Sequence, residues 1–414
     1  MRRTLLMVGC LLVLAAAVGC SLAEDTLPKG SRAGPPFPRI LNCYAAGLHQ
    51  GASQADIKRV ARYDLLCGGV DADATAEIAR VRQLNPHILI LPYVILREAD
   101  ATDRDVPEAW WARDAEGRTF EFWPGTRVLN LLLPAVQDYL VKECEKLLAD
   151  PHQFDGIFFD GYDQTIGYLN HAHPGDIDLD GDGKRDASAS RDAKWRAAEK
   201  SVIQRVASLR GGKVIVMANT WSFPNWVPAN LLHGVLAEDQ IGRVRRGYLS
   251  LDRFLAGYQK TIANSRQPVV IGVVNGGSDL NIRKYLALSH GQQAAEQAKV
   301  RANVRAMRFG LCATLMGDGY YGYDLGPHRG QHWWYPEYDS KLGYPKGPAA
   351  KARDGTWRRQ FDGGTVIVNG TGAEVYAKFD KPVEDASSGE TATTFKVPPL
   401  DGRIFLTAGT RSHR

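Results

Sequence analysis

Residues 154–163 read Phe154-Asp155-Gly156-Ile157-Phe158-Phe159-Asp160-Gly161-Tyr162-Asp163, and this stretch decides the fold prediction. A short apolar run bounded by turn-forming residues is typical of a strand that is covered on both faces, as in a parallel sheet. The run ends on Asp160. In parallel α/β folds, functional groups lie at the carboxyl ends of the strands. We therefore expect the Asp160 side chain to lie at the edge of the sheet where active sites form.

Similar runs occur on both sides of this stretch and alternate with helical patterns. The predicted strands are 39–44, 64–67, 87–94, 156–160, 214–218, 234–237, 269–274 and 313–316, and the predicted helices are 55–62, 74–84, 135–148, 193–209, 251–265 and 292–309. Eight strands alternating with helices over about 280 residues predict a (β/α)8 TIM barrel, an α/β fold. A doubly wound sheet is the alternative, but the first strand is followed by Cys43-Tyr44-Ala45-Ala46-Gly47, which lacks its glycine-rich phosphate-binding turn.

The two ends of the chain differ from this central region. After about residue 353, short strands at 365–369, 374–377, 394–397 and 403–406 follow one another without helices. We therefore expect a barrel domain over 39–350 and a small β-sandwich-like domain over 351–414. Residues 1–23 are typical of a signal peptide, and the polar, proline-containing segment 24–38 of a linker.

Two cleavage sites compete in the leader. The sequence Ala17-Val18-Gly19-Cys20 resembles a bacterial lipobox, which would leave Cys20 lipidated, whereas Ser21-Leu22-Ala23 suits ordinary signal peptidase. Either reading predicts an exported protein, periplasmic or at the cell surface, that meets a membrane only through a lipid anchor. Cys43 and Cys67 end successive predicted strands and are compatible with a disulfide or with buried thiols.

The composition excludes several classes of protein. The 414 residues are 44% hydrophobic and 23% charged, which is ordinary for a globular chain. The net charge is +5, two of the positive charges lie in the leader, and no run of five basic residues occurs. We therefore expect no nucleic-acid partner. Oligomeric state is left open.

Two acids stand at the ends of predicted strands, Asp160 after the fourth and Glu238 after the sixth. A carboxylate pair at a barrel mouth is what glycoside cleavage needs: one group protonates the leaving oxygen, and the other attacks the anomeric carbon or activates water. We expect Asp160 to be the nucleophile or base and Glu238 the general acid. The alternative is that each acid caps a helix or pairs with an arginine such as Arg97.

Further polar and aromatic residues follow the same strand ends. These candidate substrate-binding residues are Asn219, Asn275, Asp318, Trp221, Trp333, Trp334 and Tyr162. Sugar rings stack their C–H faces on aromatic rings, and their hydroxyls pair with amides and carboxylates. Ordinary packing is the alternative for each aromatic residue.

The loop at 178–186 reads Asp178-Leu179-Asp180-Gly181-Asp182-Gly183-Lys184-Arg185-Asp186. Aspartates at loop positions 1, 3, 5 and 9 with glycine at 6 match an EF-hand-type loop, although position 12 is Ala189 instead of glutamate. This pattern predicts a weak, structural Ca²⁺ site with Asp178, Asp180, Asp182 and Asp186 as ligands, and a solvated turn is the alternative. No organic cofactor is expected, because Gly317-Asp318-Gly319-Tyr320-Tyr321-Gly322 matches GxGxxG without a helix after it.

Several of these motifs together resemble hypothetical glycosyl hydrolase family 15, a family of bacterial TIM-barrel enzymes. The resemblance rests on 154–160, Val128-Leu129-Asn130, Glu238-Asp239 and the 333–339 stretch Trp-Trp-Tyr-Pro-Glu-Tyr-Asp, and it extends over about 39–406. It implies a barrel and a carbohydrate substrate.

The sequence thus predicts an exported glycoside hydrolase that cleaves O-glycosyl bonds in a poly- or oligosaccharide. The alternative is a non-catalytic, surface-tethered glycan-binding lipoprotein that keeps the barrel. A metal-dependent carbohydrate esterase is disfavoured, because no cluster of transition-metal ligands is present.

Overall fold

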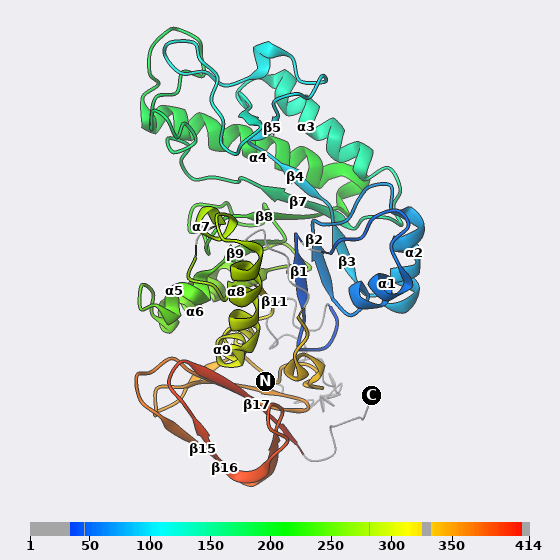
Figure 1. The fold of residues 1–414 in the computed structure, drawn as a ribbon, viewed down its shortest axis with the longest axis vertical. Coiled ribbons are helices and arrows are strands. Elements are labelled where there is room, and N and C mark those ends of the chain that lie inside the picture. Colours follow the sequence, from blue (N-terminus) through cyan, green and yellow to red (C-terminus); the bar gives the residue numbers. More distant parts are fainter. Residues whose placement is uncertain (1–33, 45, 281, 325–332, 408–414) are drawn as a thin grey trace, which may run out of the picture.

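The computed structural model describes residues 34–44, 46–280, 282–324 and 333–407. Helices alternating with parallel strands form the larger part, and an antiparallel sheet forms the C-terminal part (Figure 1). No helix in these ranges is long and apolar enough to cross a membrane. The predicted leader, with Cys20, lies outside the described residues.

The parallel strands lie in two sheets. One has the order β1 (Leu41–Cys43), β2 (Leu65–Cys67), β3 (Leu89–Leu91). The other has the order β11 (Tyr320–Asp324), β10 (Gly272–Gly276), β9 (Gly234–Glu238), β8 (Ile215–Asn219), β7 (Gly156–Asp160), β4 (Tyr93–Ile95). Only Pro92 separates β3 from β4, and proline has no N–H with which to continue the ladder.

Hydrogen bonds connect the two sheets at both ends. Ile40 forms a parallel bridge with Tyr321 beside β1 and β11, and the Asp155 N–H before β7 donates to the Ile90 carbonyl in β3 at 3.1 Å. Side chains from both sheets share one apolar cluster, which includes Leu41, Leu65, Leu91, Phe158, Met217, Leu236 and Val274. The fold is therefore of the predicted mixed α/β class, while closure into an eight-stranded barrel stays a prediction.

The helices connect these strands. They are α1 (Gln54–Val60), α2 (Thr75–Leu84), α3 (Pro134–Leu147), α4 (Ser188–Gly212), α5 (Gln240–Arg245), α6 (Leu251–Asn264), α7 (Ile282–Leu286), α8 (His290–Ala302) and α9 (Val304–Thr314). Local sequence explains several helix starts. Pro134 opens α3, the Ser250 hydroxyl caps α6, and Ser289 with Gln292 forms a capping box on α8. A hairpin of β5 (Glu98–Asp100) and β6 (Thr126–Val128) and two 3-10 turns, η1 (Glu108–Trp110) and η2 (Pro336–Asp339), lie in longer connections.

The prediction of the eighth strand at 313–316 is wrong. Ala313 and Thr314 belong to α9, and the strand is Tyr320–Asp324. The apolar run 313–316 continues the buried face of α9, and a run of four residues carries no period that separates strand from helix. The correction moves the carboxyl end of this strand from Asp318 to Asp324.

The C-terminal part consists of β12 (Ala350–Lys351), β13 (Trp357–Phe361), β14 (Gly364–Asn369), β15 (Val375–Asp385), β16 (Thr391–Val397) and β17 (Asp401–Thr407). They form one antiparallel sheet, in the order β12-β13-β14-β17-β15-β16, instead of the two sheets of a sandwich. Arg308 of α9 pairs with Asp401 at 2.7 Å, and Gly402 lies so close to Cys312 that a Cβ would be 2.4 Å from the Cys312 Cβ. These contacts hold the sheet against α9 (Figure 1).

Two further predictions are settled by packing. Phe37, within the predicted linker, is buried and bridges Gly343, so the folded part begins before residue 39. Cys43 and Cys67 are register partners on β1 and β2, and both are buried free thiols instead of a disulfide.

Candidate active site

Asp160 and Glu238 end two strands that flank β8. Asp160 is the last residue of β7, and Glu238 is the last residue of β9. Because side chains alternate along a strand, Asp160 lies on the same face as Phe158, and Glu238 on the same face as Leu236. Phe158 and Leu236 belong to the shared interior cluster. Each acid thus follows a member of that cluster on the same face of its strand, and both acids are buried, at 4% exposed.

Two donors orient the Asp160 carboxyl. The Tyr93 hydroxyl donates to Oδ2 at 2.6 Å, and the Gly161 N–H donates to Oδ1 at 2.9 Å. Gly161 has a φ of 72°, in the left-handed region, and a Cβ there would lie 2.8 Å from Nη1 of Arg97. Glycine is thus required for the turn that follows Asp160.

Glu238 lies in a poorly solvated position beside Asn219 and Tyr44. Burial and, as the second cause, the negative charge of Asp160 raise its pKa to about 8, although hydrogen bonds with Asn219 and Tyr44 oppose the shift. The Asn219 amide also donates to the Tyr44 hydroxyl at 3.2 Å. Glu238 Oε2 has no hydrogen-bond partner in the part of the chain that is described. A carboxyl group in this state holds a proton at neutral pH and has a free oxygen from which to give it.

Neither acid fills the structural roles weighed as alternatives. The Arg97 guanidinium pairs with Asp163 at 3.2 Å and approaches Glu98 at 3.9 Å. The residue that precedes α5 is Asp239, and its side chain makes no capping hydrogen bond. The charge of Asp160 does raise the pKa of Arg97, but among the described residues neither acid forms a close ion pair with Arg97 or caps a helix.

Three residues around the two acids were not identified from the sequence. Tyr44, the residue after β1, hydrogen-bonds with Glu238, and Tyr93 of β4 donates to Asp160. Asp324, 8% exposed, ends β11, and its charge also raises the pKa of Glu238. Tyr93 lies inside a predicted strand, and an aromatic residue in a buried strand is normally assigned to the hydrophobic core and not to a site. Asp324 would have followed from the alternation Tyr320-Gly322-Asp324, had β11 been identified correctly.

The remaining polar and aromatic candidates form two groups, of which the first consists of Asn219, Trp221 and Trp333. Asn219 hydrogen-bonds with Glu238, and its Oδ1 accepts the Trp221 N–H at 3.0 Å, which places the 40% exposed Trp221 beside it. Trp333 packs on Tyr323, with ring centroids 6.3 Å apart, and lines a small cavity together with Asp324. These residues lie near the ends of β8 and β11.

The structure corrects the expected positions of Asp318 and Asn275. Asp318 precedes β11 and forms an ion pair with Arg359 at 2.7 Å, with both side chains 1% exposed. It lies at the amino end of the strand, where it anchors the C-terminal sheet. Asn275 lies on the opposite face of β10 from Val274, and its amide donates to the Ala306 carbonyl of α9 at 3.2 Å.

Trp334 and Tyr162 are engaged in packing. The Trp334 N–H donates to Asp339 at 3.0 Å, and the Arg62 guanidinium lies 3.8 Å from its ring centroid. Tyr162 is 2% exposed and packs on Trp226, with centroids 4.8 Å apart. Neither ring faces the two acids through any described contact.

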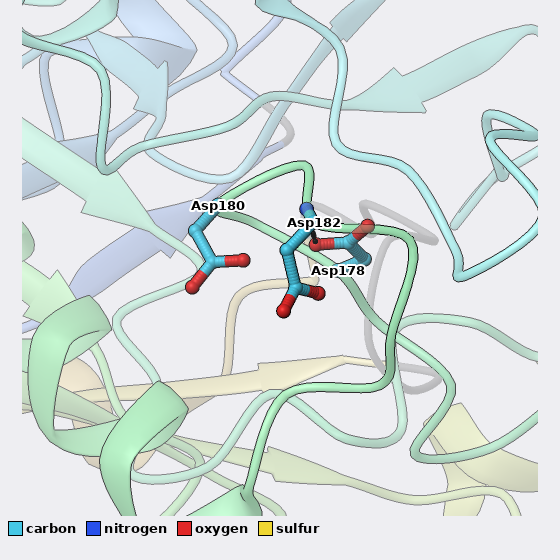
Figure 2. Close-up of side chains that lie close together, drawn as sticks. All are labelled: Asp178, Asp180 and Asp182. Atoms are coloured by element: carbon cyan, nitrogen blue, oxygen red, sulfur yellow. Dashed lines mark hydrogen bonds between the residues drawn. The ribbon is translucent and has the colours of Figure 1, made fainter.

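The predicted calcium loop brings three carboxylates together (Figure 2). Ligand oxygens of Asp178, Asp180 and Asp182 lie within 4.8 Å of one another. The oxygens of Asp178 also accept backbone N–H groups of Gly181 and Gly183 at 2.8 and 2.9 Å. Asp186 accepts the Leu179 N–H at 2.8 Å and is thus turned towards the loop backbone.

Comparisons with known proteins find one matching family model and several solved structures of similar fold. The model of hypothetical glycosyl hydrolase family 15 matches residues 83–365. No protein with a curated description matches the sequence. Among solved structures, a maltogenic α-amylase from Thermotoga neapolitana is 11% identical, with a TM-score of 0.50 over 89% of this chain and 98% of that one. A GH36 α-galactosidase from Geobacillus stearothermophilus, in complex with stachyose, is 11% identical, with a TM-score of 0.46 over 92% of this chain and 57% of that one.

Proposed function

The chain belongs to hypothetical glycosyl hydrolase family 15, and from this premise we propose that it hydrolyses O-glycosidic bonds with the carboxyl pair of Asp160 and Glu238. The observation that carries the proposal is the environment of Glu238. Burial and the charge of Asp160 raise its pKa to about 8, so that it stays protonated at neutral pH. A paired carboxylate and carboxylic acid are the two groups that glycoside hydrolysis requires.

In the proposed reaction, Glu238 gives its proton to the glycosidic oxygen as the bond between that oxygen and the anomeric carbon breaks. Asp160 stabilises the positive charge that develops at this carbon and either attacks it or takes a proton from an attacking water. In the first case, water then releases the sugar from Asp160, and Glu238 recovers its proton from that water. Carboxyl groups about 5 Å apart give retention, and a separation of about 6.5–9.5 Å gives inversion.

The proposal includes a closed (β/α)8 barrel as the scaffold. In its support, β1 is linked to β11 through the bridge of Ile40 and Tyr321, and β3 to β7 through the bond from Asp155 to Ile90. Closure would bring the ends of β7 and β9 to one mouth, at which active sites of this fold lie.

We also propose that the enzyme acts on a poly- or oligosaccharide outside the cytoplasm and carries a structural Ca²⁺. The leader at 1–23 supports export, and the Ala17–Cys20 lipobox supports a lipid anchor on Cys20. Sensitivity of processing to globomycin tests the anchor. The three clustered aspartates of the 178–186 loop support the metal ion.

The deciding experiment measures product release from a panel of oligosaccharides by wild type, Asp160→Asn and Glu238→Gln. Both variants keep the size of the side chain and remove the reacting group. We expect a loss of turnover of about 1,000-fold or more, equivalent to about 4 kcal/mol of activation free energy, with an unchanged circular dichroism spectrum. Glu145→Gln, at an exposed acid of α3, is the matched control. Full activity in either variant would remove that residue from the mechanism, and binding without turnover by wild type would favour a glycan-binding protein.

A further inference from the structure

A cavity of about 470 Å³ lies between the α5–α6 segment and the C-terminal sheet. One side of the cavity is lined by residues 244, 245, 247 and 249–252. The other side is lined by Lys351, Gly355, Trp357, the 370–372 loop and the Pro399–Leu400 turn. The described residues that contact Asp160 or Glu238 include none of these wall residues. Cavities of about 300–1,000 Å³ are the usual size of sites for small organic ligands.

Trp357 is an oriented aromatic surface in this cavity. Its indole N–H donates to Asp252 Oδ1 at 2.7 Å, and the Lys351 ammonium lies 2.5 Å from Asp252 Oδ2. The indole N–H edge of Trp357, in the C-terminal sheet, is therefore held in place by Asp252 of α6. The Trp357 side chain is only partly buried, so its apolar face remains available to a ligand that presents C–H groups.

The polar groups of the cavity carry an excess of positive charge. Lys351 and Trp357 lower the pKa of Asp252, so this side chain is a carboxylate that neutralises Lys351. Arg245, the last residue of α5, also lines the cavity and is partly buried. In the described ranges it forms no hydrogen bond and no ion pair. Burial raises the pKa of Asp239 and the charge of Arg245 opposes that rise, but Asp239 is paired with Arg246 at 2.5 Å. A guanidinium whose N–H groups have no described acceptor favours a ligand with a carboxylate, which it binds through two parallel hydrogen bonds.

We propose that this cavity is a second saccharide site, separate from the acid pair, that binds a sugar residue carrying a carboxylate. The sugar ring stacks on Trp357, and its carboxylate pairs with Arg245. Ser250, whose hydroxyl accepts the Arg253 N–H at 3.2 Å and keeps its own proton, donates to a sugar hydroxyl. The site holds an acidic polysaccharide to the enzyme and does not depend on hydrolysis.

Binding is measured by calorimetry in the Glu238→Gln background, with trigalacturonic acid as the acidic probe and maltotriose as the neutral one. Trigalacturonic acid is expected to bind at least about tenfold more tightly, because a hydrogen-bonded charge pair contributes about 1.5–3 kcal/mol. Arg245→Gln removes this preference, and Arg243→Gln, an exposed arginine of α5 outside the cavity, leaves it unchanged.

The aromatic contact has its own pair of variants. Trp357→Ala weakens binding of both probes about tenfold or more, whereas Trp357→Phe, which keeps a ring and loses the bond to Asp252, stays within about threefold. Tyr376→Ala, at a 55% exposed ring of the same sheet, is the control. Absence of binding at 10 mM of either probe, or equal binding by Trp357→Ala and the background protein, would overturn the proposal. Turnover of a short soluble substrate by wild type and Trp357→Ala separates this result from a failure of the proposed hydrolysis, which the cavity does not influence.

Discussion

The Tyr93 hydroxyl donates a 2.6 Å hydrogen bond to Asp160 Oδ2 across the boundary between β4 and β7. The bond links two strands that are register neighbours, with Tyr93 opposite Phe158 and Ile95 opposite Asp160. Burial and the Asp160 charge both raise the pKa of Tyr93, so its hydroxyl stays protonated and acts as the donor. Tyr93 is therefore a positioning residue for the proposed nucleophile or base.

Tyr93→Phe removes this donor and keeps the ring. A hydrogen bond to a charged group contributes about 1.5–3 kcal/mol, so we expect kcat to fall about 10- to 100-fold with little change in KM. Steady-state kinetics on the substrate found in the panel check this. A purely structural role would instead lower the melting temperature without a selective loss of kcat, and a variant with wild-type kcat would contradict positioning.

Asp318→Asn should destabilise the protein instead of weakening substrate binding. The substitution leaves the Arg359 guanidinium, 1% exposed, without its carboxylate partner, and breaking a buried ion pair from one side costs about 3–5 kcal/mol. Urea unfolding measures the loss, and KM of the remaining folded enzyme should be unchanged. Arg205→Gln, which removes an exposed pair with Asp138 at 2.8 Å, serves as control with little effect. A raised KM at unchanged stability would restore the sugar-binding role that the sequence predicts.

The acidic loop predicts stabilisation by calcium. Because the glutamate at loop position 12 is replaced by Ala189, we expect a dissociation constant of about 1 mM or weaker and a melting temperature that rises in 10 mM Ca²⁺ and falls with EDTA. Asp180→Asn should abolish the rise, since Asp180 is exposed and accepts no hydrogen bond in the described residues, so that its loss spares the loop itself. Differential scanning calorimetry in Ca²⁺ and in Mg²⁺ is the measurement. An equal response of wild type and Asp180→Asn would assign the loop as a solvated turn.

The order of the strands was largely predictable because buried strands such as β7 and β9 carry continuous apolar runs that end on acids. The eighth strand was not, because the buried residues Ala313, in α9, and Leu315, which caps it, belong to an apolar run that looks like a strand. The true strand, Tyr320–Asp324, has tyrosines around a glycine instead of an aliphatic run. This one error placed Asp318 at the wrong end of the strand.

The site was only partly predictable for a related reason. Asp160, Asn219 and Glu238 could be identified from the sequence, because each one directly ends an apolar run, and the end of the run marks the end of the strand. Which face a side chain occupies depends on register with both neighbouring strands, and this sends Asn275 towards α9 instead of towards Glu238. The contact of Tyr93 with Asp160 joins residues 67 positions apart in sequence, so no local pattern reveals it.

The ionisation of Glu238 predicts the pH dependence of both activity and stability. As the general acid, Glu238 must be protonated, so kcat should fall as pH rises through about 8. In the unfolded chain its pKa is near 4.5, so the native state binds the proton more tightly; both states are protonated below pH 4.5, and stability then falls with rising pH up to about 8. Urea unfolding across this range should show a flatter profile for Glu238→Gln than for wild type or the Glu145→Gln control.

Asp160→Asn tests the coupling between the two acids in the same experiment. Removing the Asp160 charge lowers the pKa of Glu238, but the effect of burial, which is the largest cause of the shift, remains. The stability profile of Asp160→Asn should therefore stop falling at a lower pH than that of wild type, and still at a higher pH than 4.5. If the profiles of Asp160→Asn and wild type coincide, the carboxyl groups do not sense each other, and the two acids do not form the pair on which the proposed hydrolysis depends.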